Sequence, residues 1–578
     1  MSDNQTSSPL IVQSDRTILL ERASPNFSET RDFLMRFSEL VKCPEHYHTY
    51  LISQLSLWNA VSVGMKPEDI IFGLDSRAKY PISTSIKSFI NDTCSIYGKF
   101  RLVSEDNKTY LEILDEKFLP VLSRVININN CLAIPYEESL STQPWFAGTL
   151  NPKRLQILRE MRGHLKVKFM DEGYPIHDIA GYRDGEPYEI NLKESLKLRN
   201  YQEEAAYAFS GDGSVEYGSG VLVLPCGAGK TIIGISAIAN IKRKTLIVTP
   251  STMALLQWKR ELLNHTTLQE EEIAEYSGNS KNLGPVTITT YQLLTGKHKA
   301  ATGESHLEYI SKIDWGLVVY DEVHLLPAPI FALASSVQAS KRLGLTATLV
   351  REDKKEGNVF SLIGPKKYDV PWKELEDKGW IANAECLEVR VALTPEYQQK
   401  YDIADKKHLF TIASTNPGKI AVIQALVEEH RDRQILIIGM YVEQLKEIAQ
   451  FLSLPHMDGA TPTKKREELL KQFRDGEIKT LVLSKVGNNA IDLPEASVAI
   501  QVSGMFGSRQ EEAQRLGRIL RPKKKGEKAY FYSVVSNNTE EMRFAMNRQL
   551  FLIEQGYEYK IVNVEEVEKK QDAVNYLM

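Results

Sequence analysis

Residues 221–239 read VLVLPCGAGKTIIGISAIA, and this stretch decides the fold class. An apolar, strand-like run leads into a loop with two glycines, a lysine and a threonine, and an apolar helix-like segment follows. This order suits phosphate binding, because glycines let backbone N–H groups approach the phosphates and the following helix points its positive end at the anion. Leu224 replaces the first glycine of the general pattern, so a glycine turn before a helix is the alternative.

Strand-like runs and helix-like segments alternate through the rest of the C-terminal two thirds of the chain. Near-continuous apolar runs separated by helices are typical of a parallel sheet covered on both faces. After the first run, this pattern predicts strands in 245–250, 286–291, 316–322 and 342–348. It restarts in 435–440, 480–485, 497–503 and 529–535, with a helix at 509–519, and so predicts a second α/β unit.

The first 190 residues have a different pattern of apolar and polar residues. Two short strands around a turn at 14–16 and helix-like spacing at 28–40, 50–63 and 82–90 predict a small α-rich domain that carries a hairpin. From 107 to 191 the chain is less periodic, with a β-like run at 165–170 and a helix expected at 152–162, which predicts a small mixed domain.

Length, net charge and cysteine content exclude several classes of protein. At ~150 residues per domain, the 578 residues suggest about four domains. The net charge of −4 excludes a histone-like basic protein and an acidic disordered tail. The five cysteines form no CxxC pair, which excludes a disulfide framework and argues against a cysteine-ligated metal site. Without an apolar run of ~18 residues or a signal peptide, the expected location is the cytoplasm.

Two adjacent carboxylates, Asp321 and Glu322, end the apolar run at 316–322. Ligands of open α/β sheets bind beyond the carboxyl ends of the strands. There, Asp321 can hold Mg²⁺ through its water shell, and Glu322 can orient and deprotonate an attacking water. Adjacent carboxylates on a loop are usually solvated surface, but these follow four apolar residues and lie 91 residues after Lys230, which suits one sheet.

A third motif, QRLGRILR at 514–521, carries arginines at every third position. Arg515, Arg518 and Arg521 would share one face of a helix. A basic surface face is the alternative, but an arginine keeps its charge and suits the transition-state charge on a γ-phosphate. A site divided between two α/β units would explain their distance from the glycine loop along the chain.

With DEVH at 321–324 and QRLGRILR at 514–521, the sequence resembles superfamily 2 helicases, and it is most similar to the XPB family of DNA repair and transcription helicases. Four stretches carry this resemblance, which spans about 9–562: PEHYHTYLISQLSLWNAVSVG (44–64), LPCGAGKT (224–231), KRLGLTATLVREDKKEGNVFSLIGPK (341–366) and the segment 511–562. Asn488–Ala490 departs from the usual Asp-Thr-Ser of the fifth motif. The absence of the long acidic N-terminal extension of eukaryotic members favours a compact bacterial or archaeal member.

The resemblance implies an α/β fold with two RecA-like parallel-sheet domains preceded by two small α+β domains. The expected domains are an XPB-type N-terminal domain (1–105), a small mixed domain that would be the family's damage-recognition domain (106–190), a first RecA-like helicase domain that binds ATP (191–375), a second with a thumb-like insertion at about 397–419 (376–562), and a C-terminal tail (563–578).

The resemblance also implies roles for individual residues around ATP and Mg²⁺, the two expected cofactors. Arg199 and Gln202 would lie near the adenine. Thr231 and Asp321 would hold the metal, and Glu322 the attacking water. The phosphates would lie against Gly227, Ala228, Gly229, Lys230 and Thr231, and the site would be completed by Gln514, Arg518 and Arg521.

A second group of residues would face DNA or couple it to ATP. The coupling residues implied by the resemblance are His324, Thr346 and Thr348. The positions along the DNA strand are Ser251, Thr290, Ser484, Lys485 and Asp492. The family's unwinding signature corresponds to Arg351, Glu352 and Asp353.

The implied function is that of an ATP-dependent DNA helicase or translocase, with the family's 3'-5' polarity and a role in DNA repair. The expected partners are DNA, ATP and a structure-specific nuclease, with no membrane. The alternatives are an RNA-directed helicase of the same superfamily and a catalytically silent scaffold for a nuclease. The intact Lys230, Asp321, Glu322 and Arg518 argue against the scaffold.

Overall fold

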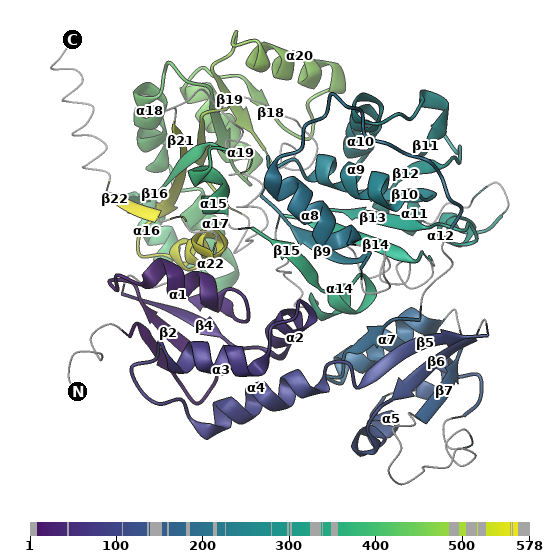
Figure 1. Ribbon diagram of the computed structural model, residues 1–578. Coiled ribbons are helices and arrows are strands. Elements are labelled where there is room, and N and C mark those ends of the chain that lie inside the picture. Colours follow the sequence, from purple (N-terminus) through teal and green to yellow (C-terminus); the bar gives the residue numbers. More distant parts are fainter. Residues whose placement is uncertain are drawn as a thin grey trace. The chain divides into compact units, whose positions relative to one another are not determined.

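The computed structural model divides the chain into two compact units, Met1–Val223 with Thr231–Asp369 and Leu224–Lys230 with Val370–Met578 (Figure 1). Among the residues described, no helix is long and apolar enough to cross a membrane. The described residues are 8–42, 46–106, 108–125, 127–135, 138, 153–158, 161–180, 185–211, 217–225, 227–278, 280–296, 300, 303–323, 337, 339–347, 356–370, 372–484, 496–504, 517, 528–554, 557 and 559–563.

The first unit contains a seven-stranded parallel sheet with the order β11-β12-β10-β13-β14-β9-β15. All five strands predicted from the apolar runs are present, and β11 and β15 extend the sheet at its two edges. The strands are β9 (Ser219–Val223), β10 (Thr245–Thr249), β11 (Ile273–Tyr276), β12 (Val286–Thr290), β13 (Leu317–Asp321), β14 (Lys341–Thr346) and β15 (Lys366–Asp369). Residues of β10 and β12 are buried along their whole length, as expected for strands covered on both faces.

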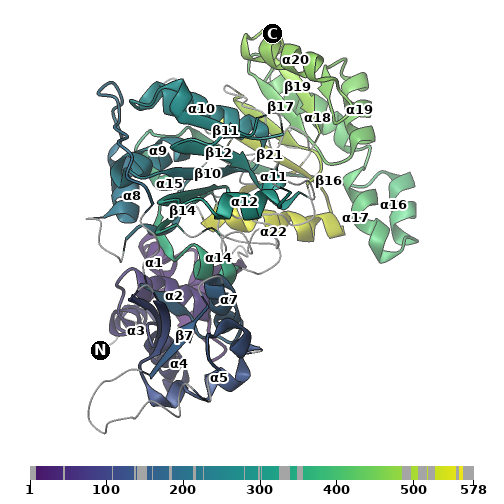
Figure 2. The same ribbon diagram turned by 90° about the vertical axis from the view of Figure 1, so that its right-hand side faces the viewer.

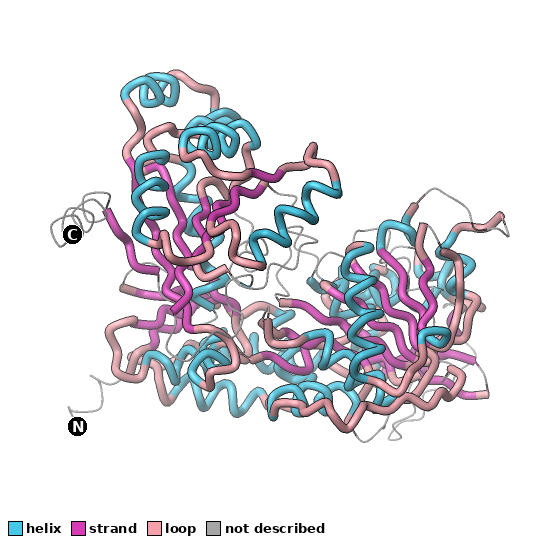
Figure 3. Tube along the Cα trace, turned by 90° about the horizontal axis from the view of Figure 1, so that it is seen from above, coloured by secondary structure: helices cyan, strands magenta, loops and turns pink. Residues whose placement is uncertain are grey.

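Helices alternate with these strands along the chain, and Figure 3 shows helices lying beside strands. They are α8 (Asn200–Ser210), α9 (Lys230–Ile241), α10 (Thr252–His265), the short η4 (Glu270–Glu272), α11 (Tyr291–Thr295), α12 (His306–Ser311) and α14 (Glu356–Leu362). Helix α9, which follows the glycine loop, buries seven consecutive residues from Ile233 to Ala239. A helix that is apolar on all sides belongs in a core, so the segment after the glycine loop is fixed inside the domain.

The N-terminal residues form a four-stranded antiparallel sheet with the order β1-β2-β4-β3. The predicted hairpin is confirmed as β1 (Leu10–Val12) and β2 (Thr17–Glu21); β3 (Glu39–Lys42), β4 (Tyr47–Leu51), α1 (Phe27–Leu34), α2 (Gln54–Ser62), α3 (Pro67–Asp75) and α4 (Thr84–Ile96) follow.

Two helix predictions in this sheet domain were too long. The helix predicted over 28–40 ends at Leu34, where the Ser38 hydroxyl donates to the Leu34 carbonyl, and β3 follows. The helix predicted from residue 50 begins only at Gln54, because Tyr50 lies in β4 and Ser53 caps α2.

A second small sheet has the order β7-β6-β5-β8. It contains β5 (Phe100–Glu105), β6 (Lys108–Ile113), β7 (Lys153–Ile157) and β8 (Ile176–Asp178), with η1 (Glu116–Phe118), α5 (Val121–Arg124), η2 (Ile128–Cys131) and α7 (Arg162–Asp171).

Two predictions for the segments around this second sheet were wrong: a strand was predicted as a helix, and a helix was predicted as a strand. Within the helix predicted at 152–162, residues Lys153–Ile157 form β7, in which alternate side chains are buried with the period of a strand. The run predicted as a strand at 165–170 lies in α7, where the buried Leu165 and Phe169 are four residues apart. The boundary predicted between residues 105 and 106 lies between the paired strands β5 and β6, so both belong to one sheet.

The second unit contains another seven-stranded parallel sheet, with the order β18-β19-β17-β20-β21-β16-β22 (Figure 2). The four predicted strands are confirmed as β17 (Ile435–Ile438), β19 (Thr480–Leu483), β20 (Val498–Gln501) and β21 (Lys528–Ser536). Three strands were not predicted, namely β16 (Asn383–Val391), β18 (His456–Met457) and β22 (Tyr559–Asn563).

The helices of the second unit are α15 (Trp372–Asp377), α16 (Pro395–Asp402), α17 (Lys406–Ser414), α18 (Lys419–Glu429), α19 (Val442–Phe451), α20 (Thr463–Arg474) and α22 (Glu540–Glu554). Helices α16 and α17 form a hairpin in the range predicted for the thumb-like insertion, and Phe410 of α17 packs edge-on against Phe544 of α22. The helix predicted at 509–519 lies almost entirely outside the described residues. The fold is therefore the predicted one, with two RecA-like parallel sheets and two small α+β domains before the first of them.

Candidate functional site

The glycine loop connects β9 to the first turn of α9. Gly227 and Gly229 have φ angles of +83° and +82°, in the left-handed region where a side chain would be strained. Between them, the Ala228 N–H donates a hydrogen bond of 3.2 Å to the Pro225 carbonyl. Lys230 is the first residue of α9 and Thr231 the second, so both stand at the positive end of a twelve-residue helix. This local geometry suits an anion such as a phosphate.

Asp321 is the last residue of β13, and two aromatic side chains hold it. One carboxylate oxygen, Oδ2, accepts a hydrogen bond of 2.9 Å from the indole Nε1–H of Trp258 in α10. The Asp321 backbone carbonyl accepts a hydrogen bond of the same length from the hydroxyl of Tyr291, the first residue of α11. Both aromatic residues are buried. The carboxylate is thus oriented by one neighbour and the backbone beneath it by another.

The Tyr291 hydroxyl remains a proton donor in this position. Burial raises the pKa of Tyr291 well above its usual value, and the nearby carboxylates of Asp321 and Glu322 raise that pKa further. The phenol is therefore neutral throughout the physiological range and keeps its hydrogen bond to the end of β13.

Glu322 has a φ angle of +52°, a conformation that non-glycine residues rarely adopt. Such strain persists only where surrounding structure holds the backbone, and it clusters at functional sites. Here the fixed end of β13 precedes it, because Tyr291 holds the Asp321 carbonyl. The turn gives the two carboxylates different backbone geometries although they are adjacent in sequence.

Gly234 of α9 makes room for Trp258. A Cβ atom at this glycine would lie 2.5 Å from the indole ring, so no larger residue fits without displacing that ring. The indole therefore contacts the helix that follows the glycine loop and also donates to Asp321. Sequence reasoning missed Trp258, Tyr291 and Gly234. The only signal was their apolar or aromatic type in helical segments, which also fits ordinary core positions.

The two residues predicted near adenine form a reciprocal cap at the start of α8. The Gln202 side-chain oxygen accepts the Arg199 backbone N–H at 2.9 Å, and the Gln202 N–H donates to the Arg199 carbonyl at 2.8 Å. The Arg199 guanidinium donates to the Tyr201 hydroxyl at 3.3 Å. This cap fixes the backbone of both residues.

The described residues predicted to follow DNA or couple it to ATP stand near strand ends. The Ser251 hydroxyl, after β10, accepts the Ala254 N–H and caps α10, and the Thr290 hydroxyl, at the end of β12, accepts the Leu293 N–H and caps α11. Thr346 is fully buried at the end of β14. In the second unit, Ser484 follows β19 and its N–H donates to the Met457 carbonyl.

Several predicted residues lie outside the described part of the chain. From the ATP group these are Gln514, Arg518 and Arg521. From the DNA and coupling group they are His324, Thr348, Arg351, Glu352, Asp353, Lys485 and Asp492. Within the described residues, no group of three or more His, Cys, Asp or Glu side chains could hold a metal ion.

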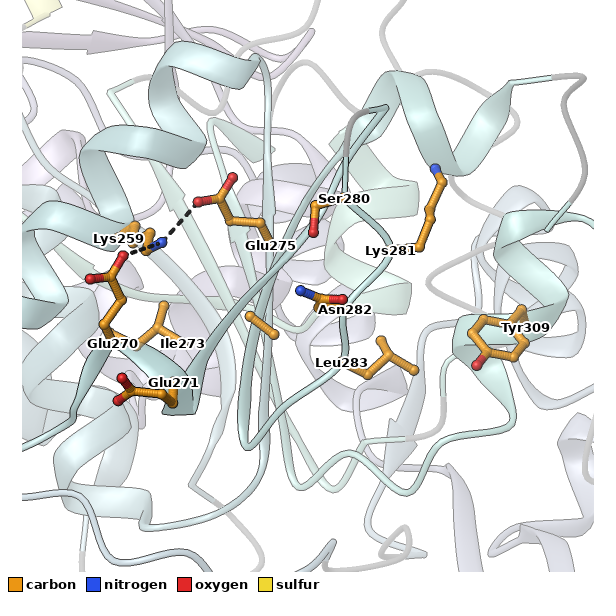
Figure 4. A pocket seen from close by; sticks show the side chains of 11 residues that line it. Lys259, Glu270, Glu271, Ile273, Glu275, Ser280, Lys281, Asn282, Leu283 and Tyr309 are labelled. Atoms are coloured by element: carbon orange, nitrogen blue, oxygen red, sulfur yellow. Dashed lines mark hydrogen bonds and ion pairs between the residues drawn. The ribbon is translucent and has the colours of Figure 1, made fainter. Parts of the chain in front are cut away.

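A cavity of about 620 Å³ lies at the β11 edge of the first large sheet (Figure 4). Lys259 lines it and makes ion pairs of 3.1 Å with Glu270 and 3.0 Å with Glu275. Leu283 and Tyr309 also line it, but no residue predicted for the site does. Because β13 is three places away from β11 in the sheet, we assign this cavity no part in the site.

Three family models match the chain. The model described as ERCC3/RAD25/XPB C-terminal helicase matches residues 375–577. The model described as helicase conserved C-terminal domain matches 10–134, and the model described as type III restriction enzyme, res subunit, matches 195–351.

Curated relatives match over nearly the whole chain. The protein named DNA 3'-5' helicase XPB from Mycobacterium tuberculosis is 46% identical over 97% of this chain and 99% of its own length. The protein of the same name from Kineococcus radiotolerans is 46% identical over 97% and 98%. The general transcription and DNA repair factor IIH helicase/translocase subunit XPB/SSL2 of Saccharomyces cerevisiae is 35% identical over 97% and 72%. As the sequence motifs predicted, this chain belongs to the XPB family of helicases.

Proposed function

We propose that this protein is an ATP-dependent DNA helicase or translocase with 3'-5' polarity that acts in DNA repair. The bacterial relatives are named DNA 3'-5' helicases, and the yeast relative is named for transcription and DNA repair. The observation that carries the proposal is the Asp321 carboxylate at the end of β13, which Trp258 orients by a hydrogen bond. Strand β13 lies in the same parallel sheet as β9, the strand that leads into the glycine loop. Carboxyl ends of parallel strands are where such sheets bind ligands.

In this proposal, ATP binds at the glycine loop with Mg²⁺. Backbone N–H groups of the loop and the Lys230 ammonium hold the phosphates. Thr231 and Asp321 would hold the metal, and their hard oxygen atoms are the ligands that Mg²⁺ prefers. The bound ion would supply positive charge to the phosphates. Trp258 fixes the direction of the Asp321 carboxylate, so that residue need not reorient when the nucleotide binds.

The proposed role of Glu322 is to orient the attacking water and accept its proton. Its φ angle of +52° gives it a backbone conformation unlike that of Asp321, the last residue of β13. Gln514, Arg518 and Arg521 of the second large sheet domain would complete the site, with the arginines stabilising transition-state charge. Arg199 and Gln202 would contact the base.

The DNA-facing roles remain those implied by the family motifs. Ser251, Thr290, Ser484, Lys485 and Asp492 would follow the strand, and His324, Thr346 and Thr348 would couple it to ATP. Arg351, Glu352 and Asp353 would separate the strands at the fork. The predicted domain boundaries other than that between residues 105 and 106, the damage-recognition role of the second small domain, a structure-specific nuclease as protein partner and the cytoplasmic location also remain proposals.

ATP hydrolysis by point variants tests the chemical part of the proposal. We expect Lys230→Ala to abolish ATP turnover, because it removes the cation at the β/γ-phosphates. We expect Glu322→Gln to bind ATP without hydrolysing it, because only the water-activating carboxylate is lost. Substantial turnover by either folded variant would contradict these roles.

The choice of nucleic acid and of motion needs separate measurements. Stimulation of ATP hydrolysis by DNA and not by RNA would favour the DNA helicase over the RNA-directed alternative. Strand displacement and triplex displacement, measured in parallel, distinguish unwinding from translocation on duplex. Absence of ATP hydrolysis in the wild-type protein would instead support the silent scaffold.

A further inference from the structure

Helix α7 of the second small domain contributes side chains to three hydrophobic clusters of the first unit. Leu165 and Phe169 lie in the core of their own domain, with side chains of β5, β6 and β7. Val167 packs against the core of the first large sheet. Met170 lies in a small cluster with Phe360 of α14. The helix is therefore shared between the second small domain and the first RecA-like domain.

The contact between α7 and α14 is closely packed. Gly357 lies in the first turn of α14, and a Cβ atom at this glycine would be 3.2 Å from Cγ of Met170. Tyr97, which follows α4, packs edge-on against Phe360 with 6.3 Å between the ring centroids. Separation of the two domains would expose these apolar side chains to water, so the packed state is the stable one.

A cluster of buried charged side chains fastens α7 to the neighbouring strand β8. The Asp178 carboxylate accepts a hydrogen bond of 3.0 Å from Nε of Arg162 and another of 3.0 Å from Nζ of Lys166. Nη2 of Arg162 donates to the second carboxylate oxygen. The side chains of Arg162, Lys166 and Asp178 are 3%, 4% and 5% exposed. Such buried charges depend on one another, because none of them is hydrated.

Arg342 adds a charge from the first RecA-like domain to this cluster. It is the second residue of β14, is 3% exposed, and donates to the hydroxyl of Ser219 at 3.4 Å. Burial by itself would raise the pKa of Asp178, but its three cationic neighbours, Arg342 among them, hold that pKa well below its usual value. The Asp178 carboxylate thus interacts with cations of both domains. Strand β14 lies between β9, which leads into the glycine loop, and β13, which ends with Asp321.

We propose that Asp178 fastens the second small domain to the first RecA-like domain, so that a displacement of the small domain by DNA reaches the sheet that carries the ATP site. This inference rests on the proposed function, because contact of the small domain with DNA is part of it. Removing one partner from a buried group of charges is costly, because the remaining charges stay desolvated. Without the carboxylate, the guanidinium groups of Arg162 and Arg342 are better solvated when the two domains separate.

The test is Asp178→Asn, which keeps the size of the side chain and removes its charge. Hydrogen exchange is measured on three segments: β6 reports folding of the small domain, β12 reports folding of the RecA-like domain, and α14 reports the contact with α7. We expect exchange in α14 to become at least about 10²-fold faster while β6 and β12 keep their protection. ATP turnover without DNA should stay within about twofold of the wild type, and the DNA-stimulated kcat should fall at least about tenfold.

A double variant tests whether the carboxylate acts between the domains. In Asp178→Asn with Arg342→Met, the buried cation of the RecA-like domain is also gone, so exchange in α14 should return to within about tenfold of the wild type. Rescue by Arg162→Met and not by Arg342→Met would show that Asp178 serves only the small domain, and would overturn the proposal. The matched control is Glu105→Gln, which removes a carboxylate of the same domain that is 58% exposed and pairs with Arg154, and it should behave as the wild type.

Two further results overturn the proposal while the proposed function stands. One is unchanged exchange in α14 of a folded Asp178→Asn protein, and the other is faster exchange there with an unchanged DNA-stimulated kcat. A wild-type protein without DNA-stimulated turnover overturns the proposed function as well. If β6 loses its protection in Asp178→Asn, Gly357→Leu replaces it, because a leucine there forces α14 away from Met170 without changing a charge. Unchanged DNA stimulation in that variant also overturns the proposal.

Discussion

Trp258→Phe tests the role of the indole N–H at the proposed metal carboxylate. Phenylalanine keeps an aromatic ring beside Gly234 but has no donor for Asp321 Oδ2. A hydrogen bond to a charged group contributes ~1.5–3 kcal/mol. Because Asp321 is partly exposed, we use the lower end of this range. A free energy of ~1.4 kcal/mol corresponds to a factor of about ten in a binding constant. Loss of a group that orients a metal ligand typically weakens metal binding ~10–100-fold.

The assay is a Mg²⁺ titration of ATP hydrolysis at fixed ATP and saturating DNA. We expect the Mg²⁺ concentration for half-maximal rate to rise by about tenfold. The matched control is Trp315→Phe in the same unit. Trp315 is also fully buried, but its indole N–H donates to the Ile310 carbonyl at 3.0 Å. Both variants lose the same volume and one hydrogen bond.

The two variants separate stability from metal binding. Each should lower the free energy of unfolding by ~1–3 kcal/mol, because each leaves a cavity and an acceptor without its donor. Only Trp258→Phe should change the Mg²⁺ dependence. An unchanged Mg²⁺ dependence in Trp258→Phe, or an equal change in Trp315→Phe, would refute the orienting role of Trp258.

Three further predictions concern other residues. Arg518→Ala should lower ATP turnover by about 10³-fold or more with a much smaller loss of nucleotide affinity, and near wild-type turnover would show that this arginine belongs to a basic surface face. Arg351→Ala with Glu352→Ala should leave DNA-stimulated hydrolysis largely intact and impair fork unwinding, when both are measured on one preparation; a parallel loss of the two activities would contradict a strand-separating role. Lys166 is buried beside Asp178, Arg162 and Arg342, and burial lowers its pKa from 10.5 to about 7. The unfolded chain therefore holds a proton between about pH 7 and 10.5 that the folded protein does not, and stability rises with pH across this window. Lys166→Met should lack this rise in denaturant titrations at pH 7 and 9, and an identical rise in the variant would exclude Lys166 as its source.

The parallel strands could be predicted because a strand covered on both faces must be apolar along its length. The strands that were missed break this rule. β15 reads KKYD and lies at a sheet edge, where burial is partial. In β16, Glu388 is buried, and its carboxylate accepts hydrogen bonds from Arg390 and from Gln549, 161 residues away. No local pattern reveals a partner so distant in sequence.

The interchange of β7 and α7 has a similar cause. The run LKVKFM alternates apolar and charged residues and so suggests a strand with one solvated face. In the structure Lys166 is buried, and Asp178 of β8 accepts a hydrogen bond from its Nζ atom at 3.0 Å. The side chain that suggested a solvent face is hydrogen-bonded within the core to a residue of another element.

The residue types of the candidate site could be predicted because chemistry restricts them. Only glycine suits the φ angles at 227 and 229, and few residues other than carboxylates serve at the end of β13. The residues that hold those groups are not restricted in this way. Trp258 and Tyr291 are 63 and 30 residues from Asp321, and each could equally have been an ordinary core residue.

Both large sheets fix the carboxyl ends of their strands with buried polar contacts. In the first, Trp258 and Tyr291 hold Asp321. In the second, Lys419 and Glu541 hold the residues after β20 and at the end of β21. Apolar packing tolerates small displacements, whereas hydrogen bonds lose strength with distance and angle. Polar contacts therefore fix these strand ends, where proposed functional groups such as Asp321 lie, and a variant that keeps volume but removes a donor should impair turnover more than its effect on stability suggests.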